Sequence, residues 1–277
     1  MNMMKIGNKE FQTKGKTYVM GILNVTPDSF SDGGRWNEMD AALRHVDEML
    51  AQGMDIVDIG GESTRPGYTR LSDAEEIDRI APVVEAVKAR FDVPISLDTY
   101  KSAVAKAGIA AGADLINDIW GLKADPDMGK VIADAGVPCC LMHNRDKADY
   151  GIFIVDMLED LKETLRIADE SGIDRSKIIL DPGVGFGKTY EHNLEAIDRL
   201  EELYQLKLPI LLGTSRKSVI GLTLNLPADQ RVEGTIATSV MAVLKQCMFV
   251  RVHDVEANVR AIRMTEAIRY GYKQRRF

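Results

Sequence analysis

Cysteine is scarce in this sequence. The chain has three cysteines: Cys139 and Cys140 are adjacent in an apolar run, and Cys247 opens another. No C-x-x-C pattern occurs, which disfavours both a disulfide framework and a zinc site built from cysteines. We therefore expect all three residues to be buried, reduced thiols.

Long hydrophobic runs are also missing. No uncharged apolar run approaches the roughly 18–20 residues that a membrane-spanning helix requires. The opening residues, MNMMKIGNKEF, lack the apolar core of a secretory signal peptide. These absences predict a cytoplasmic protein in a reducing compartment, with no membrane partner.

An excess of positive charge is absent as well. Lysine and arginine number 35 against 42 aspartates and glutamates, which gives a net charge of −7 with both signs mixed along the chain. A nucleic-acid-binding protein needs a basic face that neutralises phosphates, so no nucleic-acid partner is expected. A small anion held by a few local arginines and lysines remains compatible with this composition.

Several familiar catalytic motifs are matched only in part or are absent from the sequence. LDPGVGFGKT (180–189) ends like a P-loop, but a P-loop needs glycine where this chain has Pro182. Its glycines alternate at 183, 185 and 187, so the dinucleotide-binding pattern G-x-G-x-x-G fails too. No pair of histidines has metal-ligand spacing, and no G-x-S-x-G nucleophile elbow occurs. Nucleotide hydrolysis and hydrolysis through a protein nucleophile are therefore disfavoured.

Short apolar runs rich in β-branched residues recur along the chain. They are continuous rather than alternating, which is typical of parallel strands buried on both faces. There are eight of them, at residues 18–24, 55–60, 93–98, 113–119, 137–143, 177–181, 208–213 and 247–253.

Helical patterns lie between most of these runs. Ser72 and Glu75 form a capping-box pattern before a stretch whose apolar residues fall on one helical face. Helices then stop at glycine directly before a strand, as in AAGADLINDI (110–119), where the glycine suits a left-handed C-cap.

Eight β-then-α units in about 250 residues without a linker predict an α/β fold, a (β/α)₈ TIM barrel. A doubly wound sheet is the alternative. We expect one domain over residues 1–277, with the barrel at 18–272. Residues 1–17 would form an N-terminal hairpin, turning around Thr13–Gly15, that caps the barrel bottom.

Polar side chains follow each predicted strand at its carboxyl end. They are Asn24, Asp58, Asp98, Asn117, Asp118, His143, Asp181, the segment 215–217, Arg251 and His253. In a barrel these ends meet at one mouth, where the active sites of this fold lie. Capping of the following helix is an alternative explanation for Asp118 and Asp254. It explains Asp58, Asp98 and Asp181 poorly, because burying an unpaired carboxylate in an apolar run is costly.

The mixture of polar groups indicates the kind of ligand. Asp98, Asn117 and Asp181 suit a flat heterocycle with N–H and amino groups, because a carboxylate can accept two parallel hydrogen bonds from such an edge. The basic groups at 216, 217, 251 and 253 suit an anionic part of a substrate, especially phosphate. The long polar loops at 24–34 and 60–67 beside the same mouth are predicted to be lids that exclude water.

These features together resemble one family. The stretches GILNVTPDSFSDGG, DIVDIGGESTRPG, ISLDTYK, LINDI, LDPGVGFGKT, GTSRKS and RVHDV occur in this order between about Met20 and Val255. Their combination resembles the dihydropteroate synthase family of folate biosynthesis, which are pterin-binding enzymes. The resemblance implies a transferase that condenses 6-hydroxymethyl-7,8-dihydropterin pyrophosphate with p-aminobenzoate. The products would be 7,8-dihydropteroate and pyrophosphate, with Mg²⁺ assisting. It also implies a homodimer and a p-aminobenzoate pocket that binds sulfonamides.

The resemblance also implies a role for individual residues. Contacts to the pterin ring would come from Asp98, Asn117, Asp181 and Lys217. The pyrophosphate would be held by Asn24, Arg251 and His253, with Asn24 also near the metal. The p-aminobenzoate pocket would be shaped by Thr64, Arg65, Pro66, Phe186, Lys217 and Ser218. The catalytic set would comprise Asp98 and Lys217, joined by Asp32 and Arg65 when the lids close.

Some roles and alternatives stay open. The segment HNRDKADYGIFIV (143–155) lacks the Met- and Gly-containing turn common there in the family, so no role is assigned to Met142 or His143. Lys188 is expected to make a loop or helix-start contact rather than to bind phosphate. Alternative functions are a pterin-binding methyltransferase domain of the corrinoid-dependent type, a non-catalytic pterin-binding protein and a P-loop NTPase. The S-T-R-P-G and S-R-K-S stretches favour the synthase.

Overall fold

A computed structural model describes residues 3–25, 34–62 and 70–271, and within helix α1 it leaves out the side chains of residues 34–38. The strands are β1 (Met3–Ile6), β2 (Lys9–Gln12), β3 (Tyr18–Asn24), β4 (Ile56–Gly60), β5 (Ile95–Asp98), β6 (Leu115–Asp118), β7 (Cys139–Met142), β8 (Ile178–Asp181), β9 (Leu211–Leu212) and β10 (Phe249–Val252). The α-helices are α1 (Gly34–Ala51), α2 (Asp73–Arg90), α3 (Ser102–Ala111), α4 (Met128–Ala135), α5 (Phe153–Glu170), α6 (Tyr190–Asp198), α7 (Ser218–Leu224), α8 (Val232–Leu244) and α9 (Val255–Glu266). Short helical turns are η2 (Arg175–Lys177), η3 (Leu200–Leu206), η4 (Ala228–Gln230) and η5 (Ala267–Gly271).

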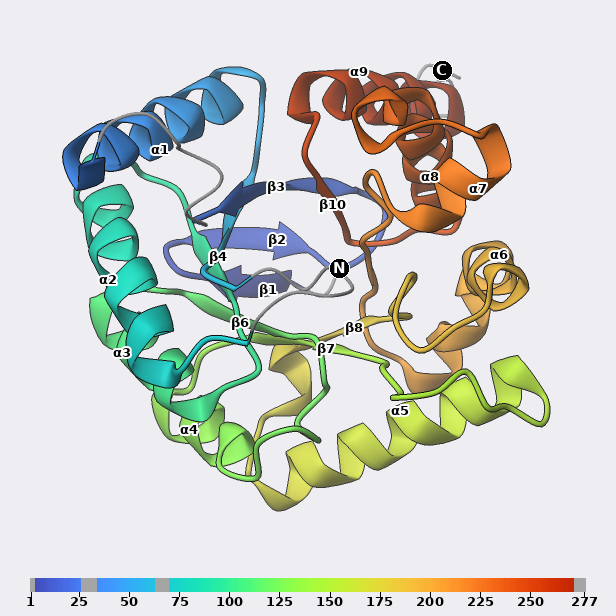
Figure 1. The fold of residues 1–277 in the computed structure, drawn as a ribbon. Coiled ribbons are helices and arrows are strands. Elements are labelled where there is room, and N and C mark those ends of the chain that lie inside the picture. The colour runs from blue at the N-terminus through green and yellow to red at the C-terminus, as the bar shows by residue number, and fades with distance from the viewer. Residues whose placement is uncertain (1–2, 26–33, 63–69, 272–277) are drawn as a thin grey trace.

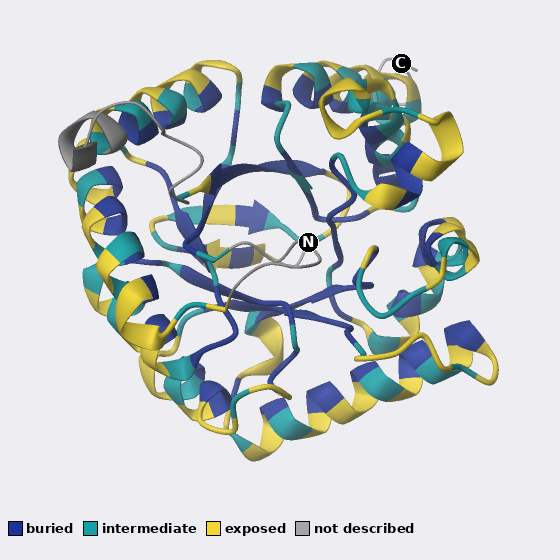
Figure 2. Ribbon diagram, viewed as in Figure 1, coloured by how far each residue is buried: buried dark blue, intermediate teal, exposed yellow. Residues whose placement is uncertain are grey.

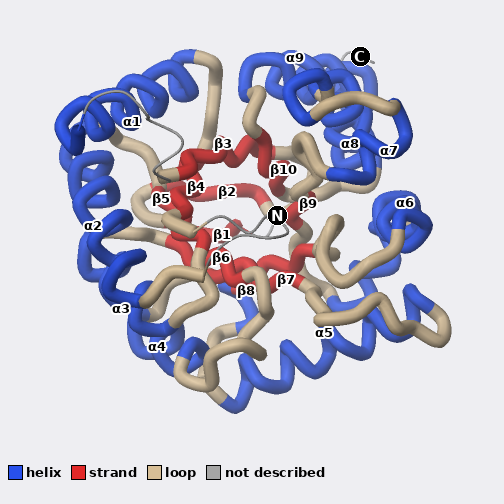
Figure 3. Tube along the Cα trace, viewed as in Figure 1, coloured by secondary structure: helices blue, strands red, loops and turns tan. Residues whose placement is uncertain are grey.

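Eight parallel strands form a barrel. Their order is β8-β7-β6-β5-β4-β3-β10-β9. A parallel bridge between Leu180 and Ile210, with the Leu180 amide 2.9 Å from the Pro209 carbonyl oxygen, joins β8 to the segment before β9 and closes the ring. Figure 3 shows this ring of strands with the helices outside it. The predicted (β/α)₈ barrel is therefore confirmed.

The strands lie where the apolar runs predicted them. Nearly every strand residue of the barrel is buried, because the helices cover one side and the barrel interior the other (Figure 2). β9 is the shortest, at two residues. Pro209 stands just before it and has no N–H to extend the ladder.

Helix ends also follow the sequence. At the start of α2 the Ser72 and Glu75 side chains each accept a hydrogen bond from the other's backbone amide, as the capping-box pattern predicted. Gly112 and Gly136 end α3 and α4 with φ of 116° and 64°, which is the left-handed conformation that glycine adopts without strain. Each helix therefore stops where the next strand must begin.

The N-terminal hairpin is present, but its turn was predicted in the wrong place. β1 and β2 pair antiparallel with Ile6 opposite Lys9, so the chain reverses at Gly7 and Asn8 rather than at Thr13–Gly15. Gly7 has a φ of 59°, which a two-residue turn requires. In Figure 1 the hairpin lies across the centre of the ring.

Apolar side chains of the hairpin seal the amino end of the barrel. Met4, Ile6 and Phe11 pack with residues from the starts of the strands, among them Tyr18 and Phe249. The Phe11 and Tyr18 rings meet edge to face at 4.9 Å. Because the amino end is filled, a ligand can enter only from the carboxyl end.

The chemistry of the cysteines agrees with the sequence. Cys139, Cys140 and Cys247 are free and fully buried, and burial raises the pKa of all three thiols. In the described part of the chain, no helix combines the length and apolarity that crossing a bilayer would take.

Candidate active site at the carboxyl end of the barrel

Three predicted side chains converge around Gly213, the residue after β9. A methyl group placed on Gly213 would lie 3.5 Å from Asp181 Oδ2, 3.8 Å from Lys217 Nζ and 3.9 Å from Arg251 Cβ. Asp181 ends β8, and Lys217 precedes α7. The barrel thus brings one carboxylate and two cationic side chains together from three separate strand ends.

Two further predicted side chains meet around Gly60, at the end of β4. A methyl group there would lie 3.7 Å from Asp98 Oδ2 and 3.9 Å from Asn24 Oδ1. Asp98 ends β5, and Asn24 ends β3, where it is exposed to solvent. The prediction that polar strand ends share one mouth therefore agrees with the geometry.

Asp58 organises the polar groups on the floor of this mouth. Its fully buried carboxylate accepts hydrogen bonds from the Ser96 hydroxyl and from Arg251 Nε, and a longer one of 3.4 Å from Asn117 Nδ2. Arg251 also donates from Nη2 to Asp98 Oδ2 at 2.7 Å. The Arg251 guanidinium, expected to face a pyrophosphate, is thus bound here by two carboxylates.

Two carboxylates around one guanidinium affect proton binding. Burial raises the pKa of Asp98 to about 7; Arg251 opposes this rise and Asp58 adds to it. The direction follows from removing a carboxylate from water beside a second one. Asp98 is thus a strand-end carboxylate whose charge responds to pH near neutrality.

Asp181 and Lys217 form the other charged part of the site. Burial raises the pKa of Asp181 and lowers that of Lys217 to about 8, while each opposes the other's shift by its charge. Asp181 Oδ1 accepts a 2.7 Å hydrogen bond from the Gly183 amide, and Lys217 Nζ donates to the Val184 carbonyl at 2.6 Å. The glycine-rich segment after β8 thereby holds both side chains.

An apolar wall adjoins these charges. Lys217 Nζ lies 4.7 Å from the centre of the Phe186 ring, a cation–π distance. Phe186 packs against a small cluster formed by Tyr100, Ile119 and Met142, together with Trp120. Met142, whose role the sequence left open, is therefore part of the apolar wall.

His253 and Arg216 differ in what holds them. The Ser215 hydroxyl lies 2.9 Å from His253 Nδ1 and accepts from the His253 amide at 3.1 Å, which fixes the histidine at the end of β10. Arg216, considered as an anion ligand, makes two hydrogen bonds to the Asp254 carboxylate. Asp254 precedes α9 but makes no side-chain cap bond, so its predicted capping role was wrong.

Asp118 binds backbone amides close to it in the chain. Its oxygens accept from the Trp120 and Leu122 amides at 2.8 and 2.7 Å, which fixes the turn after β6 rather than the start of a helix. Burial raises its pKa to about 6, opposed by these amide donors. Its carboxylate is therefore occupied by backbone.

Several predicted residues lie outside the described part of the chain. Asp32 belongs to the first long loop, and Thr64, Arg65 and Pro66 belong to the second. Ser218 is described, and it begins α7 with an exposed side chain. Of the residues predicted to shape a p-aminobenzoate pocket, Phe186, Lys217 and Ser218 are thus described.

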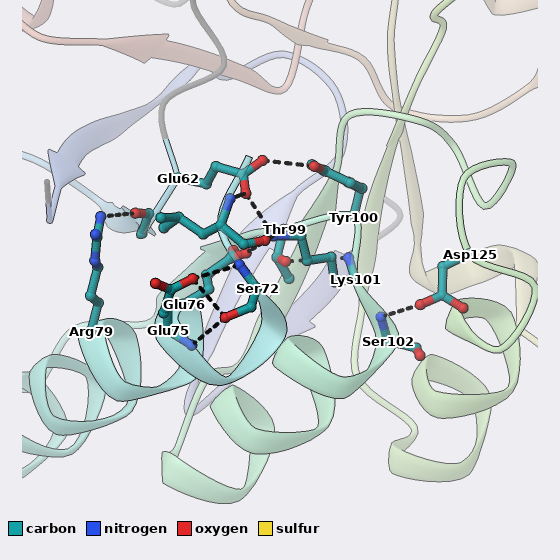
Figure 4. Close-up of polar contacts among 12 residues, drawn as sticks. Glu62, Ser72, Glu75, Glu76, Arg79, Thr99, Tyr100, Lys101, Ser102 and Asp125 are labelled. Carbon is teal, nitrogen blue, oxygen red and sulfur yellow. Dashed lines mark hydrogen bonds and ion pairs between the residues drawn. The ribbon is translucent and has the colours of Figure 1, made fainter. Parts of the chain in front are cut away.

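The two ends of the second loop are tied by a buried cluster that the sequence did not reveal (Figure 4). Lys101 Nζ donates to Glu62 at 2.6 Å, to Glu76 at 2.7 Å and to the Leu71 carbonyl at 2.9 Å. Glu62 accepts in turn from the Leu71 amide at 2.9 Å and the Tyr100 hydroxyl at 2.7 Å. Residues 62 and 71 are thereby held together on either side of the segment that carries Thr64 to Pro66.

A cavity of about 610 Å³ opens over the ends of β5, β6 and β7. Tyr100, Trp120, Asn144 and Arg145 are among the residues that line it. The side chains predicted to bind the pterin are not in its lining. Asp98 binds Arg251 and Asn117 binds Asp58, while Asp181 and Lys217 bind the backbone of the segment after β8. The cavity therefore borders the apolar wall of the site.

A metal ion would need oxygen atoms from a bound substrate to bind here. Among the residues that the structure describes, no three His, Cys, Asp or Glu side chains are grouped to hold a metal ion. Mg²⁺ commonly binds through one or two protein oxygens together with substrate phosphates and water. The exposed Asn24 amide oxygen at the mouth fits that mode.

The residues that sequence reasoning missed act by holding others. Ser96 binds Asp58, and Lys101 binds the base of the second loop. Both residues lie inside the stretch ISLDTYK, so the motif was visible. Their partners were not, because those lie on other strands and loops.

Comparison with known proteins identifies the family. Residues 20–253 match the family model described as pterin binding enzyme. The dihydropteroate synthase of Clostridium beijerinckii is 59% identical over 266 residues, which cover 96% of this chain and 99% of that protein. The dihydropteroate synthase of Bacillus subtilis is 52% identical over 255 residues, covering 92% of this chain and 90% of the other.

Solved structures agree. A Clostridium difficile dihydropteroate synthase in the presence of pteroic acid has a TM-score of 0.90 and 47% identity, covering 96% of this chain and 99% of the other. The Xanthomonas albilineans dihydropteroate synthase with 4-aminobenzoic acid has a TM-score of 0.92 and 39% identity, covering 97% and 98%. A Yersinia pestis dihydropteroate synthase with a sulfonamide drug has a TM-score of 0.90 and 43% identity, covering 97% and 99%. The chain therefore belongs to the pterin binding enzyme family, alongside these dihydropteroate synthases.

Proposed function

We propose that this protein catalyses the dihydropteroate synthase reaction. The amino nitrogen of p-aminobenzoate forms a bond to the methylene carbon of 6-hydroxymethyl-7,8-dihydropterin pyrophosphate. The carbon–oxygen bond to pyrophosphate breaks, pyrophosphate leaves with the electron pair, and the nitrogen loses one proton. The product is 7,8-dihydropteroate, and the enzyme is a transferase.

One observation carries the proposal beyond the family. Asp181 Oδ2 and Lys217 Nζ lie within 4 Å of a single point beside Gly213, and Arg251 passes the same point with its Cβ before its guanidinium reaches Asp58 and Asp98. A buried carboxylate beside an ammonium group, with a guanidinium from the same part of the mouth, suits a ligand that joins an amino-bearing heterocycle to an anion. The pteroic acid, 4-aminobenzoic acid and sulfonamide bound by the related structures have matching chemistry.

The pterin ring would bind to Asp98, Asn117, Asp181 and Lys217. Asp181 is the side chain we assign to the amino edge of the ring, because its Oδ2 faces the open side of Gly213. Asn117 and Asp98 are linked through Asp58 and Arg251, which supports a fixed set of donors and acceptors on the floor. Preorganised groups of this kind bind without reorganising during the reaction.

The pyrophosphate would bind to Asn24, Arg251 and His253. Arg251 would keep its contact with Asp58 and turn its remaining N–H groups toward the phosphates. Mg²⁺ would be held by Asn24 together with phosphate oxygens, and when bound it would neutralise charge on the leaving group. The Ser215 hydroxyl supports His253 in this position.

The p-aminobenzoate would bind against Phe186, between Lys217 and Ser218 on one side and Thr64, Arg65 and Pro66 on the other. The link between residues 62 and 71 supports this arrangement, because it fixes both ends of the loop that bears the latter three. Sulfonamides would compete for the same pocket. Asp32 and Arg65 would join the site when substrate is bound.

We further propose that the carbon–oxygen bond breaks early. Asp98 would then stabilise positive charge on the pterin methylene without bonding to it, and no strong base would be needed because the aromatic amine is a neutral nucleophile. Pyrophosphate released in the absence of p-aminobenzoate would support this order. Release that strictly requires p-aminobenzoate, with no intermediate trapped by added nucleophiles, would count against it.

The function is tested with purified protein, the dihydropterin pyrophosphate, p-aminobenzoate and Mg²⁺, by following pyrophosphate. We expect release that p-aminobenzoate accelerates and that a sulfonamide inhibits competitively. Pterin binding without any release would favour a non-catalytic pterin-binding protein. Methyl transfer to a corrinoid in place of release would favour the methyltransferase alternative.

We also propose that residues 1–277 form a single domain and that the protein is a homodimer. The packing of the hairpin against the amino end of the barrel supports one domain, since both contribute to one core cluster. Exposed apolar side chains on the C-terminal helices, including Leu222, Met264 and Ile268, support an interface there.

A further inference from the structure

Lys188, the residue that gives LDPGVGFGKT its likeness to a P-loop, binds the segment it belongs to. Its Nζ lies 2.9 Å from the Gly183 carbonyl oxygen and 3.0 Å from that of Phe186. His143 is the third close neighbour, with its Nδ1 at 2.8 Å and its carbonyl oxygen at 3.4 Å. The three N–H donors of an ammonium group therefore all find acceptors here.

His143 is held in turn from the opposite side. Its Nε2 lies 2.9 Å from Asp160 Oδ2, on helix α5. The same carboxylate oxygen accepts from Arg145 Nε. Because an ammonium donates only, the His143 ring accepts at Nδ1 and carries its proton at Nε2, toward Asp160. Helix α5, the segment after β7 and the segment after β8 are thus joined in one chain of hydrogen bonds.

Other side chains also bind the segment after β8: the Gly185 amide donates to Asn193 Oδ1 at 2.6 Å, and the Tyr150 hydroxyl donates to the Gly187 carbonyl at 2.8 Å. Neither of these two contacts reaches the carbonyl groups of Gly183 and Phe186 that Lys188 binds.

Gly183, Gly185 and Gly187 have φ of 69°, 89° and 53°. A methyl group on Gly183 would lie 1.9 Å from the His143 carbonyl oxygen, and one on Gly187 would lie 2.2 Å from that of Arg145. Two backbone segments therefore touch without side chains between them, and glycine leaves the segment intrinsically free to move.

The segment's two functional side chains are fixed differently. Asp181 belongs to β8, whose ladder pairs it with Met142 of β7. Phe186 lies beyond the strand, and its amide bonds to the Gly183 carbonyl at 3.1 Å. Lys188 binds the carbonyl groups at both ends of this turn, so its hydrogen bonds act on Phe186, whereas it affects Asp181 through its charge, which opposes the rise that burial causes in the pKa of that carboxyl.

We propose that Lys188 is a positioning residue for the aromatic amine substrate: it holds the turn from Gly183 to Phe186, and His143 and Asp160 hold Lys188. The assignment of the ring of Phe186 to that substrate rests on the proposed function. The hydrogen bonds by which Lys188 holds the turn do not depend on that function.

The kinetic test compares Lys188→Met with Lys177→Met. Lys177 is the matched control, because its Nζ also donates to a glycine carbonyl, that of Gly136 at 2.7 Å, but at the opposite end of β8. For Lys188→Met we expect KM for p-aminobenzoate to rise roughly tenfold, as for loss of a hydrogen bond to a charged group, while KM for the pterin substrate changes less than about twofold. Lys177→Met should change neither constant.

The second test reads the free protein by amide hydrogen exchange. In Lys188→Met the Phe186 amide should exchange at least several-fold faster, while the amides of β8 keep the wild-type rate. Lys177→Met should show wild-type exchange at Phe186. Asp160→Asn, which removes the support of His143 at the partly exposed end of the chain of bonds, should show the same changes to a smaller degree and provides the comparison if Lys188→Met does not fold.

The outcomes separate the two proposals. An active wild-type protein whose Lys188→Met variant shows unchanged constants and unchanged exchange would overturn the positioning role. Equal rises in both KM values with faster exchange throughout the barrel would overturn it too, because they indicate a general loss of stability. An inactive wild-type protein would overturn the proposed function, and exchange at Phe186 would then decide the positioning role by itself.

Discussion

Asp181 ends β8 with one carboxylate oxygen bound to the Gly183 amide and the other beside Gly213. We predict that Asp181→Ala weakens pterin binding by about 2–4 kcal/mol, because a buried donor edge of the ligand would lose its charged acceptor. Isothermal titration with a pterin measures this. Asp174→Ala is the control, since Asp174 caps an exposed turn at the other end of the same strand. Unchanged affinity in Asp181→Ala would mean that the ring binds elsewhere.

His143 predicts a pH dependence of stability. Burial lowers its pKa from 6.5 to about 4, against the opposing hydrogen bond to Asp160. The unfolded state therefore binds more protons between pH 4 and 6.5, so stability present above pH 6.5 is lost as pH falls toward 4. The full effect is about 3 kcal/mol, from the size of the shift.

This dependence is measured by urea unfolding of the wild type and of His143→Gln from pH 7 to 4. The wild type should lose about 3 kcal/mol more than the variant over this range. The exposed His45 supplies the control, because His45→Gln should follow the wild-type curve. If the free energy of unfolding of the wild type and of His143→Gln changed in parallel with pH, His143 would bind its proton as readily in the folded state as in the unfolded state.

Single positions show what sequence can and cannot predict. Asp98 and Asp181 were predicted because a carboxylate at the end of a buried strand has few structural explanations. The state of Arg251 was not predicted, because its partners Asp58 and Asp98 lie 193 and 153 residues away. Only closure of the barrel brings β10 next to β3, so that Arg251 can reach Asp58 on β4 and Asp98 on β5, and no local pattern records that distance.

At the level of elements, Lys101 connects the end of β4, the start of α2 and the start of α3. It lies almost fully buried between the equally buried Glu62 and Glu76. Burial raises the pKa of Glu76, while for Glu62 and Lys101 the mutual hydrogen bonds outweigh burial and stabilise the charged forms. One ammonium group thus allows two neighbouring carboxylates to stay in the interior.

Lys101→Met should therefore destabilise the fold by about 3–5 kcal/mol, the usual cost of leaving a buried charge without its partner. Denaturant unfolding measures the change. Lys130→Met, which breaks an exposed pair with Asp134 on α4, should alter stability by less than about 0.5 kcal/mol. A Lys101→Met protein as stable as the wild type would show that water or proton uptake replaces the ammonium at little cost.

Elements were predicted with uneven success, for physical reasons. Barrel strands are buried on both faces, so their apolar runs are unmistakable, and Gly112 and Gly136 mark helix ends by their left-handed conformation. The hairpin turn was placed at Thr13–Gly15 because that stretch is polar and contains glycine. The actual turn lies at Gly7 and Asn8, because apolar side chains of β1 and β2 must face the amino end of the barrel. That requirement comes from tertiary packing and not from the local sequence.

For the molecule as a whole, exposed apolar side chains predict self-association. Leu222 and Leu224 on α7 and Met264 and Ile268 near the C-terminus are between 44% and 68% exposed. Sedimentation equilibrium should give the mass of a dimer at micromolar concentration, because burying such side chains against a second copy removes them from water. Leu222→Glu should shift the equilibrium toward monomer, whereas Ile152→Glu, at the start of α5, should not. A monomeric wild type would refute the predicted dimer.

If the side chains at the carboxyl ends of the strands condense two substrates into one product, both products must appear together. Incubating the protein with both substrates and Mg²⁺, and measuring dihydropteroate and pyrophosphate in the same sample, shows whether they do. We predict that they form in a one-to-one ratio and that Asp181→Ala greatly reduces both. Pyrophosphate without dihydropteroate, or no turnover of either, would contradict the account.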